Sequence, residues 1–282
     1  MKIGAPLIIN LACTGVVPIR AMSPHVPLSH SEIVDNVAVC LESGVQMVHL
    51  HARDAQGCPT GDPEPYGRLI EAIRALPGGR QAVIGVTTSG RQDASFAVRS
   101  QVLDLDGDMQ PDMGSLTLSS LNFAQSASVN APNVIRALAG RMLERGIRPE
   151  LEVFDSGMAN FAKVLLKEGV IKPPLYVNVL LGNVSGSQAD LLQLAAILAA
   201  LPEECTVCVA GLGRFQLLAN GLGILGTDGV RVGLEDNLWL DQARTTPATN
   251  LALVQRVIAQ AALFERSLMP LMELRSRLGM SA

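Results

Sequence analysis

Residues 31–51, SEIVDNVAVCLESGVQMVHLH, contain the pattern that decides the fold. An amphipathic helical stretch over Ser31–Ser43 is followed, after one glycine, by a short apolar strand over Val45–His51. The same order recurs through the rest of the chain, where apolar runs rich in β-branched residues alternate with amphipathic stretches. This alternation is typical of repeated βα units that build a parallel sheet.

Eight strands are predicted, at Pro6–Cys13, Val45–His51, Ala82–Thr87, Met113–Leu118, Glu150–Phe154, Leu175–Leu181, Thr206–Ala210 and Gly229–Gly233. The main helices are predicted at Ser31–Ser43, Pro65–Ala75, Ala131–Arg145, Ser156–Glu168, Ser187–Ala200, Gln216–Leu225 and Asn250–Ser267. Ser31 and Ser187 are the clearest candidates for N-terminal caps. A basic segment through Arg275 and Arg277 follows the last helix.

Eight strands that alternate with helices could form a closed barrel or an open, doubly wound sheet. The open alternative would favour a Gly-x-Gly-x-x-Gly turn after the first strand, but that strand runs into Thr14-Gly15-Val16-Val17-Pro18. A length of 282 residues is near that of a single barrel, and no low-complexity linker divides the chain. We therefore predict an α/β protein with one (β/α)8 TIM barrel domain over residues 1–282.

The composition narrows the range of partners. Hydrophobic residues make up 48% of the chain and charged residues 17%, with a formal net charge of -4. The chain has no basic run and no basic patch interleaved with aromatic residues, which argues against nucleic acid and anionic membranes as partners. No apolar run reaches the roughly 18 residues of a spanning helix, and the first residues lack a secretory signal. We expect a cytoplasmic protein that acts on small molecules.

His49-Leu50-His51 ends the second predicted strand. Because side chains alternate along a strand, both imidazoles point to one face, at the carboxyl end of a buried strand. The pair could chelate a metal. For this motif taken alone, a hydrogen-bonded pair of core histidines is the alternative.

The last predicted strand brings a third candidate ligand. By the same alternation, Arg231, Gly233 and Glu235 share one face. In a closed barrel, the first strand alone separates this strand from the second, so Glu235 can reach a metal beside His49 and His51. Two histidines and one carboxylate leave an open coordination position, which is typical of catalytic zinc.

Asp236 is next to this carboxylate and is not needed as a ligand, so it is free to act as a base. Arg231 could orient that base or bind a substrate carboxylate with two parallel hydrogen bonds. An ion pair of Arg231 with Glu150 or Glu152 at the barrel rim is the structural alternative.

Three turns could bind anionic groups. Thr87-Thr88-Ser89-Gly90 and Ser115-Leu116-Thr117-Leu118-Ser119 end the third and fourth strands, and their hydroxyls and backbone amides could bind a carboxylate. Serine and threonine also cap helices, which is at least as good an account of each turn alone. Gly211-Leu212-Gly213 follows the seventh strand, where barrels often bind phosphate, so it could take the phosphates of a nucleotide-bearing cofactor.

With these motifs in this order, the sequence resembles the β-keto acid cleavage enzymes over nearly its whole length. The resemblance rests on Thr14-Gly15, His49–Asp54 (HLHARD), Thr87–Gly90 (TTSG), Ser120–Phe123 (SLNF), Pro149–Asp155 (PELEVFD), Gly211–Gln216 (GLGRFQ) and Val230–Asn237 (VRVGLEDN). It implies a zinc-dependent barrel that condenses a β-keto acid with acetyl-CoA. The products would be acetoacetate and a new acyl-CoA, released in a retro-Claisen step.

The resemblance also implies roles for single residues. His49, His51 and Glu235 would bind one zinc ion, and Asp236, oriented by Arg231, would be the base. We expect Asp236 to form the enolate of acetyl-CoA. The substrate carboxylate would contact Thr87 and Gly90, with Thr117 nearby, and CoA would contact Gly211, Gly213 and Arg214. Members of the family suggest a homotetramer, and the alanine- and leucine-rich helices are suited to subunit contacts.

One residue departs from the family members that act on 3-keto-5-aminohexanoate. These members carry a glutamate for the substrate amine just after Thr-Gly, where this chain has Val17. An amine buried there without a partner would cost on the order of several kcal/mol. We therefore predict a substrate with a neutral or apolar tail, while Arg20 leaves a β-keto diacid open.

Two other functions remain open from the residues alone. The first is a metal-dependent hydrolase or aldolase on a similar barrel, although the chain lacks the further histidines and modified lysine that such hydrolases commonly use. The second is a metabolite-binding barrel with a structural metal, which the open coordination position and the spare Asp236 disfavour.

Overall fold

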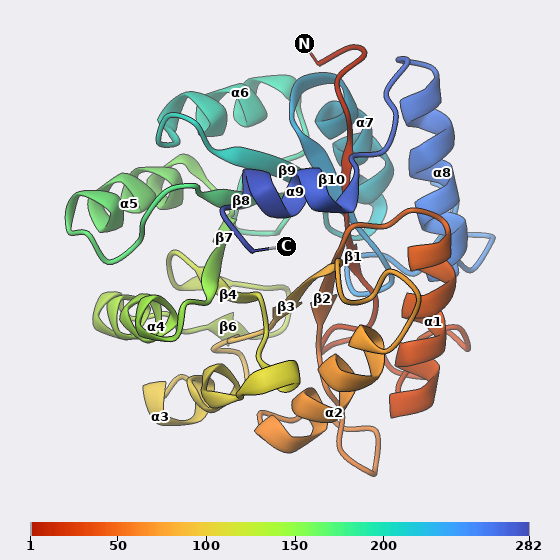
Figure 1. Ribbon diagram of the computed structural model, residues 1–282. Helices are drawn as coiled ribbons and strands as arrows, with labels where there is room; N and C mark the ends of the chain where they lie inside the picture. The colour runs from red at the N-terminus through yellow and green to blue at the C-terminus, as the bar shows by residue number, and fades with distance from the viewer. Residues whose placement is uncertain (1, 282) are drawn as a thin grey trace.

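The computed structural model describes residues 2–281, in which eight parallel strands form a closed barrel (Figure 1). The order around the barrel is β1-β10-β9-β8-β7-β4-β3-β2. The strands are β1 (Ile8–Ala12), β2 (Met47–Leu50), β3 (Val83–Val86), β4 (Met113–Thr117), β7 (Arg148–Val153), β8 (Tyr176–Leu181), β9 (Thr206–Gly211) and β10 (Gly229–Val232). The predicted (β/α)8 TIM barrel is confirmed, and β1 separates β2 from β10 as expected.

Most of the helices lie around the outside of the barrel (Figure 1). They are α1 (His30–Glu42), α2 (Pro63–Arg74), α3 (Phe96–Arg99), α4 (Pro132–Arg145), α5 (Ser156–Lys167), α6 (Leu191–Ala200), α7 (Gln216–Gly226), α8 (Asn250–Ala262) and α9 (Leu271–Arg277). Short 3-10 turns occur at Gln101–Asp104, Gly107–Met109 and Gly213–Phe215. No helix within residues 2–281 combines the length and apolar character of a membrane span.

The N-terminal caps of α1 and α6 differ from the predicted Ser31 and Ser187. Ser29 caps α1, because its hydroxyl accepts the backbone N–H of Glu32 while the Glu32 carboxylate accepts the backbone N–H of Ser29. Asp190 caps α6, because its carboxylate accepts the backbone N–H of Gln193. Ser187 lies in the preceding loop, where its N–H donates to the carbonyl of Phe154.

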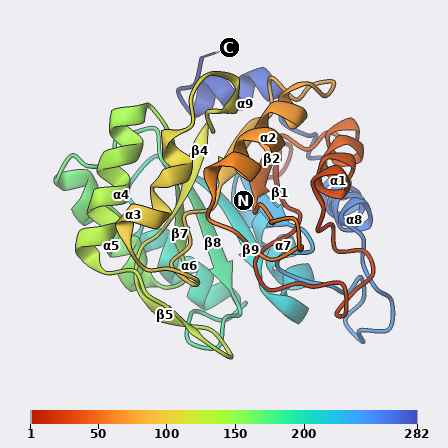
Figure 2. The same ribbon diagram turned by 90° about the horizontal axis from the view of Figure 1, so that it is seen from below.

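The chain after α8 closes one end of the barrel. The predicted helix Asn250–Ser267 ends at Ala262, and the basic segment that follows forms α9. Figure 2 shows α9 at one end of the barrel and β5 (Leu121–Asn122), part of a hairpin with β6 (Ala127–Ser128), at the other. The hairpin follows β4, so it lies at the carboxyl ends of the strands, and α9 covers the amino ends.

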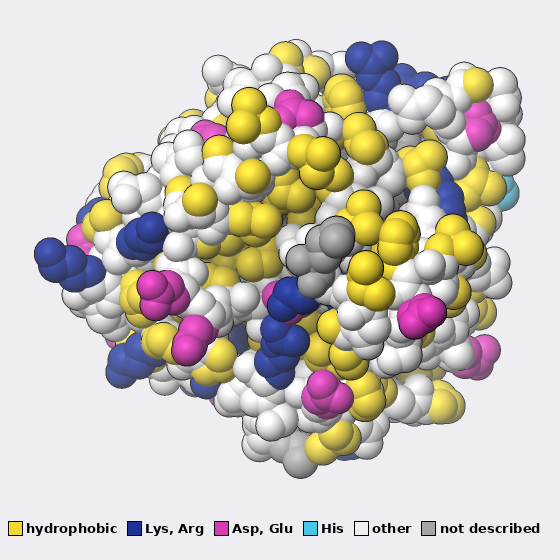
Figure 3. Space-filling model, turned by 90° about the horizontal axis from the view of Figure 1, so that it is seen from above, with side chains coloured by type: hydrophobic (Ala, Val, Ile, Leu, Met, Phe, Trp, Pro, Cys, Tyr) yellow, Lys and Arg dark blue, Asp and Glu magenta, His cyan; other side chains and the backbone are white. Residues whose placement is uncertain are grey.

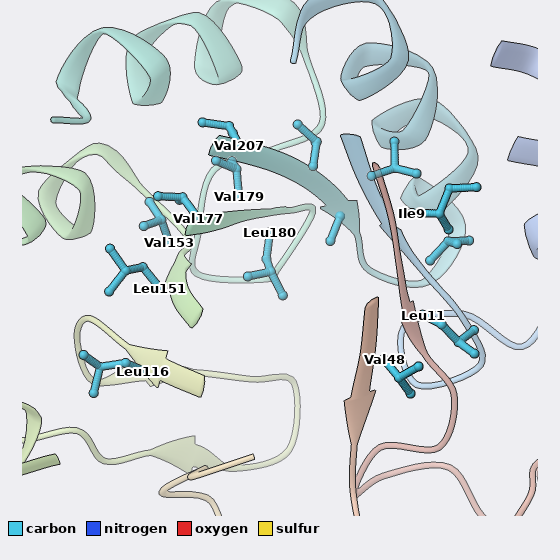
Figure 4. Close-up of a cluster of buried hydrophobic side chains, with 14 of the residues drawn as sticks. Ile9, Leu11, Val48, Leu116, Leu151, Val153, Val177, Val179, Leu180 and Val207 are labelled. Carbon is cyan, nitrogen blue, oxygen red and sulfur yellow. The ribbon is translucent and has the colours of Figure 1, made fainter. Parts of the chain in front are cut away.

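Two apolar clusters support the barrel. The larger one fills the space between the strands and the surrounding helices, and Figure 4 shows part of it, including Ile9, Leu11 and Val48. The smaller one lies inside the barrel at its amino end, where Ile8 and Met47 pack with Leu274 and Leu278 from the α9 region. Above this apolar floor, the inward side chains become polar.

Part of the surface is apolar as well. Figure 3 shows hydrophobic side chains spread over the face seen from above. Large exposed examples are Leu191 and Leu192 on α6, Leu218 on α7, and Leu263 just after α8. Such a surface is suited to subunit contacts, and the homotetramer stays a prediction.

Candidate active site at the carboxyl ends of the strands

Three side chains converge at the carboxyl end of the barrel. His49 lies on β2, His51 follows that strand, and Glu235 follows β10. The two imidazole Nε2 atoms lie 3.2 Å apart, and His51 Nε2 lies 3.2 Å from Glu235 Oε1. His49 Nε2 lies 3.9 Å from Glu235 Oε2. Their three ligand atoms are within 4.8 Å of one another, close enough to bind one metal ion together.

Two glycines make room for this arrangement. Gly233, with φ +155°, crosses the backbone of β1 so closely that a Cβ would lie 2.0 Å from the Ala12 carbonyl oxygen. Gly15, with φ +72°, packs against Glu235, and a Cβ there would lie 2.5 Å from the glutamate Cγ. Both positions therefore require glycine, for conformation and for space.

Glu150 fixes the orientation of His49, a role that the sequence analysis missed. His49 Nδ1 lies 2.8 Å from Glu150 Oε2, and both side chains are buried. Asn10 and Asn178 each donate an amide hydrogen to the other carboxylate oxygen, at 2.8 and 2.5 Å. On β3, the strand beside His49, Gly85 leaves the space that Glu150 occupies, because a Cβ there would lie 3.2 Å from Glu150 Oε2. The carboxylate thus favours the tautomer whose Nε2 lone pair faces Glu235 and His51.

Arg231 is buried among carboxylates. It donates from Nε and Nη2 to the two oxygens of Asp236, at 3.0 and 3.2 Å, and from Nη2 to Glu235 Oε1 at 2.7 Å. Its Nη1 lies 3.5 Å from Glu152 Oε1. The rim ion pair considered above therefore exists with Glu152, whereas Glu150 is bound to His49. Arg231 both orients Asp236 and takes part in this ion pair.

The charges make the two adjacent acids chemically different. Although burial opposes ionisation, the positive charge of Arg231 and the two histidines hold the pKa of Glu235 well below its usual range. Burial, together with the negative charge of Glu235, raises the pKa of Asp236. Glu235 is therefore suited to be a permanent ligand, whereas Asp236 is the stronger base of the two.

A cavity of about 1080 Å³ opens above these groups. Of the residues predicted to bind substrate or CoA, Val17, Thr87, Thr117, Gly213 and Arg214 line it. Gly90 and Gly211 do not form its wall: a Cβ on Gly90 would meet the Val129 carbonyl, and one on Gly211 would meet Phe215. These two glycines allow close packing behind the wall.

The cavity wall also contains two arginines that the sequence analysis did not single out, Arg91 and Arg244. Arg20, in contrast, donates to Glu32 and to the carbonyl of Pro24, and it does not line the cavity. Because Arg20 pairs with Glu32 outside the cavity, it does not support the β-keto diacid alternative that was based on it.

Comparison with known proteins places this geometry in a family. A sequence model of the β-keto acid cleavage enzymes matches residues 6–280. The 3-keto-5-aminohexanoate cleavage enzyme of Fusobacterium nucleatum is 34% identical over 258 residues, which are 90% of this chain and 91% of that protein. The 3-oxoadipate:acetyl-CoA acetyltransferase of Cupriavidus necator is 33% identical over 278 residues, 98% of this chain and 95% of that protein.

A solved structure shows the same fold. The apo structure of ObcA aligns with a TM-score of 0.79 at 20% identity, over 92% of this chain and 66% of ObcA. The chain therefore spans about two thirds of the length of ObcA, and the likeness concerns the fold alone. The predicted enzyme class, acyl transfer with carbon–carbon bond cleavage, is confirmed by the family match and the names of the relatives. This chain belongs to the β-keto acid cleavage enzyme family.

Proposed function

We propose that this protein binds one zinc ion through His49, His51 and Glu235 and cleaves a β-keto acid in the presence of acetyl-CoA. The products would be acetoacetate and a new acyl-CoA. The observation that carries the proposal is the convergence of two imidazole nitrogens and a carboxylate beside the buried pair of Arg231 and Asp236.

The residues fit a divalent cation. Glu235 Oε2 is buried and has no hydrogen-bond partner within residues 2–281, as expected for a ligand atom. Four carboxylates, those of Glu150, Glu152, Glu235 and Asp236, surround Arg231 and the two histidines. Bound zinc would offset this negative charge and would polarise a carbonyl oxygen at its open position.

The products define what the base must do. Acetoacetate contains the acetyl group joined to C1 and C2 of the keto acid, so the new bond forms at C2 and the bond from C2 to C3 breaks. CoA moves to C3. Asp236 therefore removes a proton from C2 of the keto acid and returns it there after cleavage. This differs from the expectation of an acetyl-CoA enolate, which the balance of atoms does not support.

Arg231 prepares Asp236 for this transfer. The two hydrogen bonds hold both carboxylate oxygens, and the side chains of both residues are almost fully buried. A base that is fixed and shielded from water loses little free energy in reorganisation when the proton moves.

The cavity wall supports the proposed binding of both substrates. The Thr87 hydroxyl accepts the backbone N–H of Ser89, so its own hydrogen remains free for a substrate carboxylate. Thr117 instead donates its hydroxyl hydrogen to Glu152 at 2.6 Å, so in this arrangement it lines the wall without a free donor. At the rim, Arg214 and Arg244 are exposed and have no ion pair within residues 2–281. Gly213 precedes Arg214 and lies close to Arg244, because a Cβ there would be 3.5 Å from Arg244 Nη2. These arginines are suited to the phosphates of CoA.

Val17 supports a substrate without an amine. Val17 is 54% exposed at the cavity wall, and the exposed apolar side chains of Ile19 and Met22 line the same cavity. No carboxylate of this segment replaces the missing glutamate. We therefore expect β-ketohexanoate to be cleaved faster than 3-keto-5-aminohexanoate, and the reverse order would contradict this assignment.

The test is a panel of β-keto acids with and without acetyl-CoA, with acetoacetate and acyl-CoA as the measured products. Loss of keto acid without acetyl-CoA would favour the hydrolase or aldolase alternative.

Asp236→Asn should retain bound zinc but lose about 10²–10⁴-fold in rate, the usual contribution of a general base. Unchanged turnover would remove Asp236 from the mechanism.

A further inference from the structure

Arg91 is a cation without an anionic partner in the cavity of the active site. It follows the Thr87–Gly90 turn after β3 and lines the same cavity as His49 and Asp236. Within residues 2–281, its guanidinium makes neither an ion pair nor a hydrogen bond to a protein acceptor. Most other arginines near the site are used: Arg231 holds three carboxylates, and Arg99 donates to Thr88 and Asn130.

Aromatic packing holds the Arg91 guanidinium in place. Its carbon lies 3.3 Å from the centre of the Phe123 ring, which comes from the β5–β6 hairpin. Phe123 in turn packs edge-on against Phe154, with the ring centres 5.9 Å apart. The stacking fixes the plane of the guanidinium while its N–H groups remain available, as in a preformed site for a carboxylate.

In the described part of the chain, the surroundings of Arg91 leave its charge without a directly paired anion. The side chain is partly buried, and burial lowers its pKa, because the charged form loses hydration. The opposing influences come from Glu235, Glu152 and Asp236, which face the same cavity. None of these carboxylates pairs with Arg91 directly. The hydrogen bonds of a ligand carboxylate could therefore replace the hydration that the guanidinium loses on burial.

Position in the cavity distinguishes Arg91 from the arginines assigned to CoA. Arg214 and Arg244 are exposed at the rim, whereas Arg91 is partly buried near the catalytic acids. The long pantetheine arm of CoA separates its phosphates from the thioester, so the phosphates belong at the rim. Arg91 is therefore within reach of the keto acid. Neutral donors at Thr87 and Ser89 are available for the carboxylate that every β-keto acid has.

From these contacts we infer that Arg91 binds a second carboxylate, at the distal end of the substrate, and that the enzyme prefers β-keto diacids to monoacids of the same length. The inference rests on the proposed function and makes it more specific: among substrates without an amine, it favours a carboxylate tail over the neutral or apolar tail expected from Val17. It also replaces Arg20 as the residue that would recognise a diacid.

The test compares 3-oxoadipate with 3-oxohexanoate, which differ only in the distal carboxylate. Affinities are measured by calorimetry on the zinc-loaded protein without acetyl-CoA, with freshly prepared acids because β-keto acids lose CO2. The wild type should bind the diacid at least about tenfold more tightly. Arg91→Met should weaken diacid binding by about ten- to hundredfold and leave monoacid binding within about threefold.

Two further variants sharpen the result. Arg91→Lys should restore part of the diacid affinity, because the charge returns without the paired N–H groups. Arg20→Met, which alters an arginine outside the cavity, should leave both affinities unchanged. Monoacid binding by Arg91→Met shows that the site is still folded.

Three outcomes would overturn the inference. Equal loss of both acids in Arg91→Met would mean that Arg91 binds the shared carboxylate. Unchanged affinity for both acids in Arg91→Met would mean that Arg91 binds neither carboxylate. A wild type that binds the diacid no more tightly than the monoacid would show that there is no diacid preference to explain. If the preference and its loss are both seen but acetyl-CoA yields no acyl-CoA, the proposed function fails while the diacid site stands.

Discussion

Replacing Glu150 with glutamine tests how the barrel prepares the metal site. The glutamine oxygen would keep the two hydrogen bonds from Asn10 and Asn178, because these amides can only donate in their present orientation. The new NH2 group would then face His49 Nδ1, which Glu150 now contacts at 2.8 Å. Nδ1 would have to accept, so the proton would move to Nε2, the atom that faces the metal position.

The expected cost follows from this change of tautomer. Loss of an outer carboxylate partner of a metal-binding histidine commonly lowers metal affinity about 10–100-fold. This corresponds to about 1.4–2.8 kcal/mol. Glu150→Gln should therefore bind zinc 10–100-fold more weakly, as measured by competition with a fluorescent chelator on metal-free protein.

The matched control is Glu152→Gln on the same strand. Glu152 also points into the barrel, but its partners are Arg231 and Thr117, not a histidine. Its replacement should leave zinc affinity within about threefold. Thermal unfolding of both variants checks that the barrel is intact. Equal zinc affinities for Glu150→Gln and the wild type would refute the proposed orientation of His49.

Two further predictions use pairs of positions in the fold. Gly15→Ala and Gly146→Ala both place a Cβ at positive φ, which alone should cost about 1–2 kcal/mol in the free energy of unfolding, and the clash with Glu235 should make Gly15→Ala the more costly of the two. Only Gly15→Ala would press on the ligand carboxylate, so only this variant should lose zinc affinity, and a loss in both would argue for a general effect. Leu274→Ala should cost about 2–5 kcal/mol in urea unfolding because the side chain is fully buried in the floor of the barrel. Met272→Ala on the same helix, where the side chain is exposed, should change stability by less than about 0.5 kcal/mol, and similar losses for both would contradict the role of α9 as a plug.

The barrel strands were predictable because their sequence signal is local. Each is a short apolar run between turns, and counting eight of them was enough to choose the closed barrel. The helix α9 was not predictable in this way, because it has seven residues and carries Arg275 and Arg277. The helix is stabilised by contacts with parts of the chain that are distant in sequence. Leu274 packs into the amino end of the barrel, and Arg275 forms an ion pair with Asp112.

The candidate metal site was predictable for a topological reason. The alternation of side chains along a strand predicted which residues point inward. Closure of the barrel predicted that only β1 separates β10 from β2. The same reasoning could not choose between Glu150 and Glu152, because both point inward on β7. The contact of Glu150 with His49 depends on the space at Gly85, and Gly85 is beside His49 only in the observed strand register.

The side chains that point into the barrel change from apolar to polar between its amino and carboxyl ends, and their proposed roles change with this depth. Along β2 and the residue after it, Met47 lies in the apolar floor, His49 lies one layer above, and His51 lies at the cavity, each two residues further along. On β7, Glu150 is fully buried against His49, while Glu152 reaches the cavity wall. Glu150 has no access to the cavity, so its charge must pair with neighbouring side chains, and its role is to orient His49. Substitution of Glu150 should therefore change metal affinity and geometry, whereas substitutions of cavity-wall residues other than the three proposed ligands should change which substrate is bound.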